Sequence, residues 1–171
     1  HVLGHGTASG PMGEAVDESF SQLAPEDMHA VVAYLRSVPA TSSDLPATLA
    51  PAAPASHKQG TMIADTRGKQ VFEGACASCH SWTGVSPIIP FATLTGARAV
   101  NDPSATNVAQ IVISGTRRNT PHGAVVMPAF GSSYSNAEIA AVANYVTARF
   151  GSKGSELTES DVASLRRQSA Q

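Results

Sequence analysis

The pentapeptide Cys76-Ala-Ser-Cys79-His80 is the stretch that decides the fold of this chain. Its two cysteines, the only ones among 171 residues, lie one helical turn apart, and a histidine follows the second directly. Upstream, Gly68 and Phe72 precede Cys76 at spacings of four, which predicts a helix that begins near Asp65, whose carboxylate can cap it. A glycine inside a helix costs about 1 kcal/mol relative to alanine. Gly68 therefore indicates that another helix approaches closely at this point.

The spacing Cys-x-x-Cys-His is the attachment signature of c-type haem. Thiols one turn apart can bond to the two vinyl groups on one edge of the porphyrin, and the histidine that follows points its imidazole at the iron. A zinc site would need a second Cys/His pair, which the sequence lacks. A thioredoxin-like dithiol would follow a strand, whereas a helix is expected here. A simple structural disulfide between the two cysteines is the remaining alternative. The motif therefore predicts one covalent haem c, attached through Cys76 and Cys79, with His80 as an iron ligand.

A second axial ligand is expected from Met127, which lies 47 residues after His80, directly before Pro128, in a stretch that reads as an irregular loop. A thioether is a soft ligand, and His/Met ligation raises the reduction potential of a haem. His122 is the rival in the same stretch, and Met62 is a poorer candidate because it precedes the attachment motif. Core filling is the alternative role of Met127. Ordinary surface roles are expected for the histidines at positions 1, 5, 29 and 57.

Other residues are expected to surround the ligands. The carbonyl of Pro87 or Pro90 is a candidate acceptor for the Nδ1–H of His80, and the sequence does not decide between them. Trp82 and Arg98 are candidates to reach a haem propionate, although ordinary surface or packing roles are favoured for both. The candidate apolar wall of the haem consists of Ile88, Ile89, Phe91, Leu94, Ile111 and Val112.

Periodic apolar residues and capping signals predict further helices. The first begins at Pro25 and stops before Pro39. Another is expected to begin at Asp102-Pro103 and to end at Gly115, followed by an irregular stretch from 116 to 133. Ser135 and Glu138 form a capping box that opens a helix closed by Gly151. A short last helix with a thin apolar face is expected from Thr158.

The chain divides into four predicted segments: a helical remnant of a preceding domain at 1–38, a Pro/Ala-rich linker at 39–61, a main domain at 62–150, and a tail with a short helix at 151–171. Residues 27–35 echo residues 138–146, and each helix follows a short loop that contains a methionine, Met12 or Met127. We interpret the echo as two copies of one module, the first without its front half. The remnant has an apolar helix face, which is expected to dock on the main domain or on the missing part.

Composition excludes some classes of protein. A net charge of −2 and 14% charged residues do not suggest a nucleic-acid binder. No apolar run approaches the roughly 18–20 residues that span a bilayer. The chain opens with His1 and shows no signal-peptide pattern, which indicates a mature product or a piece of a longer protein.

The chain resembles class I cytochromes c at Gly68, Phe72, the CASCH motif, the VMPAF string around Met127, and Tyr145. This resemblance covers about residues 62–150. It implies an all-α fold in which the first and last helices cross around a covalent haem. The wider pattern is similar to the end of a three-haem cytochrome subunit of membrane-bound bacterial dehydrogenases. In that family the preceding module also carries a haem with a methionine ligand. Met12 matches that position, but no second Cys-x-x-Cys-His precedes it.

The resemblance implies an electron-transfer subunit rather than an enzyme. Its expected partners are a catalytic subunit of flavin, quinoprotein or molybdenum type, neighbouring haem domains, and a quinone or other acceptor, with no nucleic acid. Export before haem attachment implies a periplasmic location, with membrane association through the complex. The alternative is a peroxidase-like or gas-binding haem protein with an open sixth position, where His122 or Arg117 would act in place of Met127.

Overall fold

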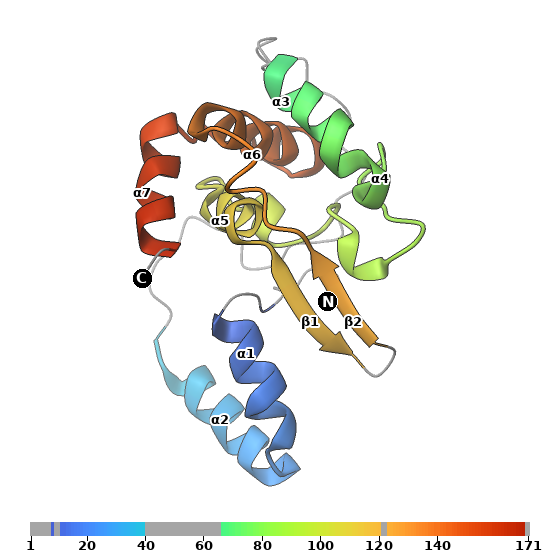
Figure 1. The fold of residues 1–171 in the computed structure, drawn as a ribbon. Coiled ribbons are helices and arrows are strands. Elements are labelled where there is room, and N and C mark those ends of the chain that lie inside the picture. The colour runs from blue at the N-terminus through green and yellow to red at the C-terminus, as the bar shows by residue number, and fades with distance from the viewer. Residues whose placement is uncertain (1–7, 9–10, 40–65, 121–122, 170–171) are drawn as a thin grey trace.

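The computed structural model describes residue 8 and residues 11–39, 66–120 and 123–169. Nearly all of the predicted linker, the Asp65 cap, Met62, His122 and the histidines at 1, 5 and 57 lie outside these residues. The fold is mostly helical with one small hairpin (Figure 1). Its helices are α1 (Pro11–Glu18), α2 (Pro25–Ser37), α3 (Thr66–Val71), α4 (Ala77–His80), α5 (Thr106–Ser114), α6 (Asn136–Phe150) and α7 (Glu159–Ser169). Shorter turns are η1 (Phe20–Gln22), η2 (Phe72–Cys76), η3 (Pro90–Ala92) and η4 (Ala99–Asn101), and the strands are β1 (Thr116–Thr120) and β2 (Gly123–Met127).

Helices α3 and α6 pack directly against each other, as Gly68 predicted. A Cβ atom added to Gly68 would collide with the backbone carbonyl of Ala141 and would lie 3.0 Å from the Cβ of Tyr145. One turn further, the buried ring of Phe72 stacks at centroid distances of 5.5 Å from Tyr145 and 5.2 Å from Phe150. The predicted contact between the first and last helices of the main domain is therefore confirmed. The glycine allows the two backbones to approach, and the aromatic rings fill the space beside it.

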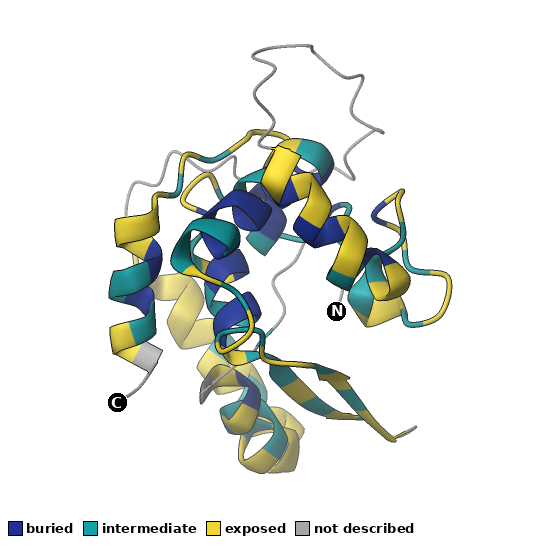
Figure 2. Cartoon of the chain, turned by 45° about the horizontal axis from the view of Figure 1, so that its top comes forward, coloured by how far each residue is buried: buried dark blue, intermediate teal, exposed yellow. Residues whose placement is uncertain are grey.

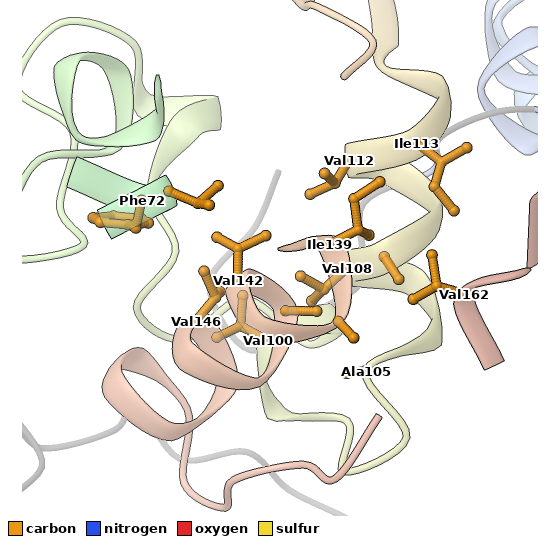
Figure 3. Close-up of a cluster of buried hydrophobic side chains, with 14 of the residues drawn as sticks. Phe72, Val100, Ala105, Val108, Val112, Ile113, Ile139, Val142, Val146 and Val162 are labelled. Atoms are coloured by element: carbon orange, nitrogen blue, oxygen red, sulfur yellow. The ribbon is translucent and has the colours of Figure 1, made fainter. Parts of the chain in front are cut away.

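The core lies where α5, α6 and α7 meet (Figure 3). Val108 on α5, Ile139 and Val142 on α6, and Val162 on α7 are buried there. The last helix presents few apolar residues, as expected, yet Val162 and Leu165 are both buried. The segment before α7 is held by Asn144, whose Nδ2 donates to the carbonyl of Leu157 at 2.9 Å. Residues after 150 thus complete the core.

The N-terminus of α6 carries the predicted capping box. The Oγ of Ser135 accepts from the backbone N–H of Glu138 at 3.3 Å, and a carboxylate oxygen of Glu138 accepts from the backbone N–H of Ser135 at 2.8 Å. The hydrogen bonds from Ser135 hold the pKa of Glu138 below its ordinary value. This box fixes the start of the helix that packs against α3.

Replacing Ser135 by alanine is expected to lower the free energy of unfolding by about 1 kcal/mol, because the hydroxyl that caps α6 is lost. The pKa of Glu138 should rise at the same time, since its strongest hydrogen-bond donor disappears. Urea denaturation of the variant measures the first effect, and carboxyl titration by NMR measures the second. Ser133, an exposed serine two residues earlier, gives the matched control S133A. Equal stability of the two variants would contradict the capping role.

Helix α5 begins at Thr106, so the predicted start at Asp102-Pro103 is wrong. Asp102 instead closes a turn, because its Oδ1 accepts from the backbone N–H of Ser104 at 2.9 Å. Ala105 then takes a left-handed conformation with φ of 52° and serves as the N-cap. The predicted end is confirmed: Gly115 closes the helix with φ of 67°.

The stretch from 116 to 133 is not irregular throughout, because β1 and β2 form an antiparallel hairpin within it. The register pairs Thr116 with Met127 and Arg118 with Val125. Met127 is therefore the last residue of a strand rather than part of a loop. The polar residues of β1 gave no hydrophobic alternation from which a strand could be predicted.

The N-terminal helices differ from their predicted description. Met12 lies within α1 rather than in a loop, and its side chain is exposed. Two hydrogen bonds join this segment to the hairpin: the Nη1 of Arg118 donates to the carbonyl of Ala8, before α1, at 2.8 Å, and the backbone N–H of Asn119 donates to the carboxylate of Asp17, within α1, at 3.2 Å. The N-terminal segment thus contacts the hairpin through α1, whereas α2, whose apolar face was expected to dock, has no buried residue (Figure 2). Helices α2 and α6, which echo each other in sequence, differ in burial.

None of the helices in the described ranges combines the length and the apolar character needed to cross a membrane.

Candidate functional site

The four predicted site residues lie around one cavity, which we call the CASCH pocket. Cys76 ends the π-helical turn η2, Cys79 and His80 lie on α4, and Met127 ends β2. All four line the pocket. The rest of the wall is largely apolar and includes Phe72, Leu94, Val108, Ile111, Val112, Phe130, Val142 and Val146. The fold therefore brings together residues that are 51 positions apart, from Cys76 to Met127.

His80 is oriented by a backbone carbonyl. Its Nδ1 lies 2.6 Å from the carbonyl oxygen of Ala92, so neither Pro87 nor Pro90 supplies this acceptor. Pro90 acts indirectly, because it opens the turn η3 that ends at Ala92. Burial lowers the pKa of His80, and the hydrogen bond to Ala92 opposes that effect. A neutral imidazole that donates through Nδ1 keeps the lone pair of Nε2 for a metal ion.

The two cysteines are free thiols in different surroundings. Cys79 is exposed, whereas Cys76 is half-buried, and burial together with the neighbouring Cys79 raises the pKa of Cys76 to about 11. Redox-active dithiols have a cysteine whose pKa is lowered. The environment of Cys76 therefore disfavours the thioredoxin-like alternative.

Met127 is held close to the end of α5. A Cβ atom on Gly115 would lie 2.6 Å from the carbonyl oxygen of Met127, so this glycine permits the approach. After Pro128 the chain is bonded to α5 again, through the N–H of Phe130 to the carbonyl of Val112 at 2.9 Å. The backbone before Met127 is thus held by pairing with β1, and the backbone after it is hydrogen-bonded to α5.

Arg166 on α7 provides a second anchor that sequence reasoning missed. Its guanidinium donates to the carbonyl of Gly131, to the carbonyl of Tyr134 at 2.6 Å, and to the Oδ1 of Asn136 at 2.6 Å. Gly131 and Tyr134 lie in the turn between Met127 and α6, and Asn136 is the first residue of α6. An arginine near the end of the chain, beside a second arginine at 167, carries no sequence signal for such a role.

Most of the predicted wall is confirmed. Ile89, Phe91, Leu94, Ile111 and Val112 line the pocket, whereas Ile88 does not and is 72% exposed. Trp82 and Arg98 do not line it either, and Trp82 is exposed.

Among the lining residues that were not predicted are two on β1, Thr116 and Arg118. Arg118 lines the pocket in place of the neighbouring Arg117, which is exposed. The Oγ1 of Thr116 is buried and has no hydrogen-bond partner among the described residues. The alternation of inward and outward side chains along β1 would have found both residues had the strand been recognised.

The pocket fits a haem. Apolar side chains form its wall, an imidazole and a thioether face it, and a pair of thiols lies at its border. These are the donor types that hold haem iron and attach a c-type haem covalently. The orphaned hydroxyl of Thr116 points to an absent polar partner.

Comparison with known proteins gives a family match over the same region. The model of the family described as cytochrome c oxidase, cbb3-type, subunit III matches residues 64–146. The fructose dehydrogenase cytochrome subunit of Gluconobacter japonicus is 31% identical over 95% of this chain and 37% of its own length. The gluconate 2-dehydrogenase cytochrome c subunit of Pantoea cypripedii is 30% identical over 95% of this chain and 38% of its own length. The alcohol dehydrogenase (quinone) cytochrome c subunit of Gluconacetobacter polyoxogenes is 27% identical over 96% of this chain and 36% of its own length.

The chain thus spans little more than a third of the length of these relatives. The match to the family model covers α3 to α6 and includes the CASCH motif and Met127. The chain contains a cytochrome c domain, the class of domain that transfers electrons through haem, and it is a distant homologue of the cytochrome subunits of dehydrogenases.

Proposed function

We propose that this domain carries one haem c, bonded to Cys76 and Cys79 and ligated by His80 and Met127, and that it relays single electrons. The observation that carries the proposal is the convergence of these four residues on one apolar pocket within the matched domain. When bound, haem supplies the reversible one-electron chemistry of its iron. No substrate-binding or proton-transferring residue is needed for this function.

The residues of the pocket have separable roles in this proposal. The carbonyl of Ala92 orients the imidazole of His80, so that Nε2 faces the pocket. Gly115 and the bond from Phe130 to α5 fix the position of Met127. The apolar side chains exclude water. If His80 and Met127 held the haem as proposed, both ligands would lie on anchored backbone, and few atoms would need to move when the charge of the site changes.

The partners follow from the relatives. Three of them are named as cytochrome subunits of fructose, gluconate 2- and alcohol dehydrogenases. We therefore propose that the electron donor is a dehydrogenase catalytic subunit or a neighbouring haem domain, and that the acceptor is a quinone or another carrier. A periplasmic location, with membrane association through the complex, belongs to the same proposal.

The competing hypothesis is a haem iron with an open sixth coordination position, for which Arg117 was a candidate residue of the distal pocket. Arg117 is exposed on β1 and does not line the pocket, whereas Met127 does. These placements favour ligation by Met127 over a distal pocket built around Arg117.

The experiment is expression of the full chain in a periplasm equipped for haem attachment. The expected product is red, is heavier than the polypeptide by one haem in denaturing mass spectrometry, and does not bind carbon monoxide when reduced at neutral pH. A variant with both Cys76 and Cys79 changed to serine should lose the covalent haem. Haem that is extracted by acidified organic solvent from the wild-type chain would overturn the attachment, and ready carbon monoxide binding would overturn the closed coordination.

A further inference from the structure

The inner face of β1 presents a polar pair to the CASCH pocket. Thr116 and Arg118 are half-buried, whereas Arg117 and Asn119, which alternate with them, are exposed. The hairpin register places Thr116 opposite Met127 and Arg118 opposite Val125, and side chains of cross-strand partners lie on the same face. All four of these residues line the pocket. The hydroxyl and the guanidinium therefore share the face that carries the candidate iron ligand.

The buried hydroxyl of Thr116 lacks a hydrogen-bond partner within the described part of the fold. Its Oγ1 is buried, and no described residue hydrogen-bonds to it. A buried donor without an acceptor costs about 1–3 kcal/mol. Because Thr116 lines the pocket, an occupant of the pocket can supply the acceptor.

Arg118 gives the same face a fixed positive charge. Among the lining residues that the structure describes, it is the one with a permanent charge. Its Nη1 donates to the carbonyl of Ala8 at 2.8 Å, which uses one of five N–H donors and holds the guanidinium at the pocket. A half-buried guanidinium beside apolar side chains is stabilised by an anion, and its planar fork matches a carboxylate.

We propose that Thr116 and Arg118 bind a carboxylate of the molecule that fills the CASCH pocket. Haem carries propionate side chains, so this inference rests on the proposed function and deepens it. The pair takes the role for which Trp82 and Arg98 were candidates, since neither of those residues lines the pocket. It also connects the N-terminal segment to the cofactor site, because Ala8 orients the arginine.

The test compares holoprotein variants with a control on the same strand. R118Q removes the charge that faces the pocket, and R117Q removes an equal charge from the exposed face. Removing a cation near the iron stabilises the ferric form, so both changes lower the reduction potential. A half-buried charge is screened less than an exposed one. The expected shift for R118Q is therefore several times that for R117Q, with R118K intermediate between R118Q and wild type.

The hydroxyl is tested with T116V, which keeps the shape of the side chain, and with T116S, which keeps the donor. The propionate bending vibration in the resonance Raman spectrum reports hydrogen bonding to the carboxylate. T116V should shift this band, and T116S should restore it. The thioether–iron charge-transfer absorption of Met127 should be unchanged in both variants.

Equal potential shifts in R117Q and R118Q would overturn the role of the arginine. An unshifted propionate band in T116V would overturn the role of the hydroxyl, and so would a change confined to the thioether–iron absorption, which would assign Thr116 to Met127. If R118Q does not incorporate haem, the reduction potential of R118K and the propionate band of T116V are compared with those of the wild-type protein. Failure of the proposed function is distinguishable, because a wild-type chain that binds no haem would show neither band, and loss of the covalent bonds alone is read by denaturing mass spectrometry.

Discussion

Replacing Met127 by alanine is expected to open the sixth coordination position of the haem iron and to lower the reduction potential sharply. A thioether ligand favours the ferrous state, and His/Met ligation gives the higher potentials among c-type cytochromes. The fall should be a sizeable part of the roughly 0.8 V range over which axial ligands set haem potentials. Alanine carries no donor atom, so the reduced variant should bind carbon monoxide, which the wild-type protein should exclude. Spectroelectrochemical titration and the visible spectrum of the reduced protein with carbon monoxide measure the two effects.

Two controls separate Met127 from its rivals. H122A removes the other ligand that the sequence offered, and M12A removes a methionine that is 55% exposed on α1. Both should keep the wild-type potential and stay closed to carbon monoxide. If H122A opens the iron while M127A leaves it closed, the ligand is His122 and the proposed coordination is wrong.

Replacing Gly68 by alanine is expected to lower the free energy of unfolding of the domain by up to about 2 kcal/mol, the overpacking cost less the gain in helix propensity. Alanine would improve the helix propensity of α3 by about 1 kcal/mol. The added Cβ, however, meets the backbone carbonyl of Ala141 rather than the end of a flexible side chain. Helices α3 and α6 must therefore move apart, which disturbs the packing of Phe72 on Tyr145. Overpacking of a close contact typically costs 1–3 kcal/mol, occasionally more. Denaturant unfolding of the holoprotein measures the difference.

Gly74 provides the matched control for this experiment. It follows Gly68 by six residues, and a Cβ added to it would meet nothing within 4 Å. G74A should leave the stability unchanged or raise it by about 0.4–1 kcal/mol, because alanine reduces the entropy of the unfolded chain. Equal losses in G68A and G74A would show that the cost comes from the backbone of this segment and not from the contact with α6.

The features that could be predicted from sequence are those in which the side chain itself makes the bond or the contact. The CASCH motif identifies its chemistry through residue types at fixed spacing. Gly68 indicates a close helix contact because a glycine destabilises a helix unless close packing requires it. Ser135 and Glu138 mark the start of α6 because both side chains make the capping hydrogen bonds.

The features that sequence reasoning missed depend on backbone atoms or on the cofactor site. The acceptor for His80 is the carbonyl of Ala92, and every residue carries a carbonyl. The start of α5 depends on the left-handed φ of Ala105, a residue that rarely adopts it. Strand β1 reads as polar because its inner face, with Thr116 and Arg118, meets a pocket rather than an apolar core.

The hydrogen bonds of Arg166 have a consequence for the local motions of the site. The turn that follows Met127 is bonded to α5 on one side and to α7 on the other. If Met127 ligates the iron as proposed, a movement of this turn that released the methionine would strain the hydrogen bonds from Arg166. We therefore expect opening of the sixth position to be coupled to loosening of α7. Helix α7 lies beyond residue 146, where the family match ends. In the proposed coordination, the lifetime of the bond between Met127 and the iron would thus depend in part on a helix outside the matched region.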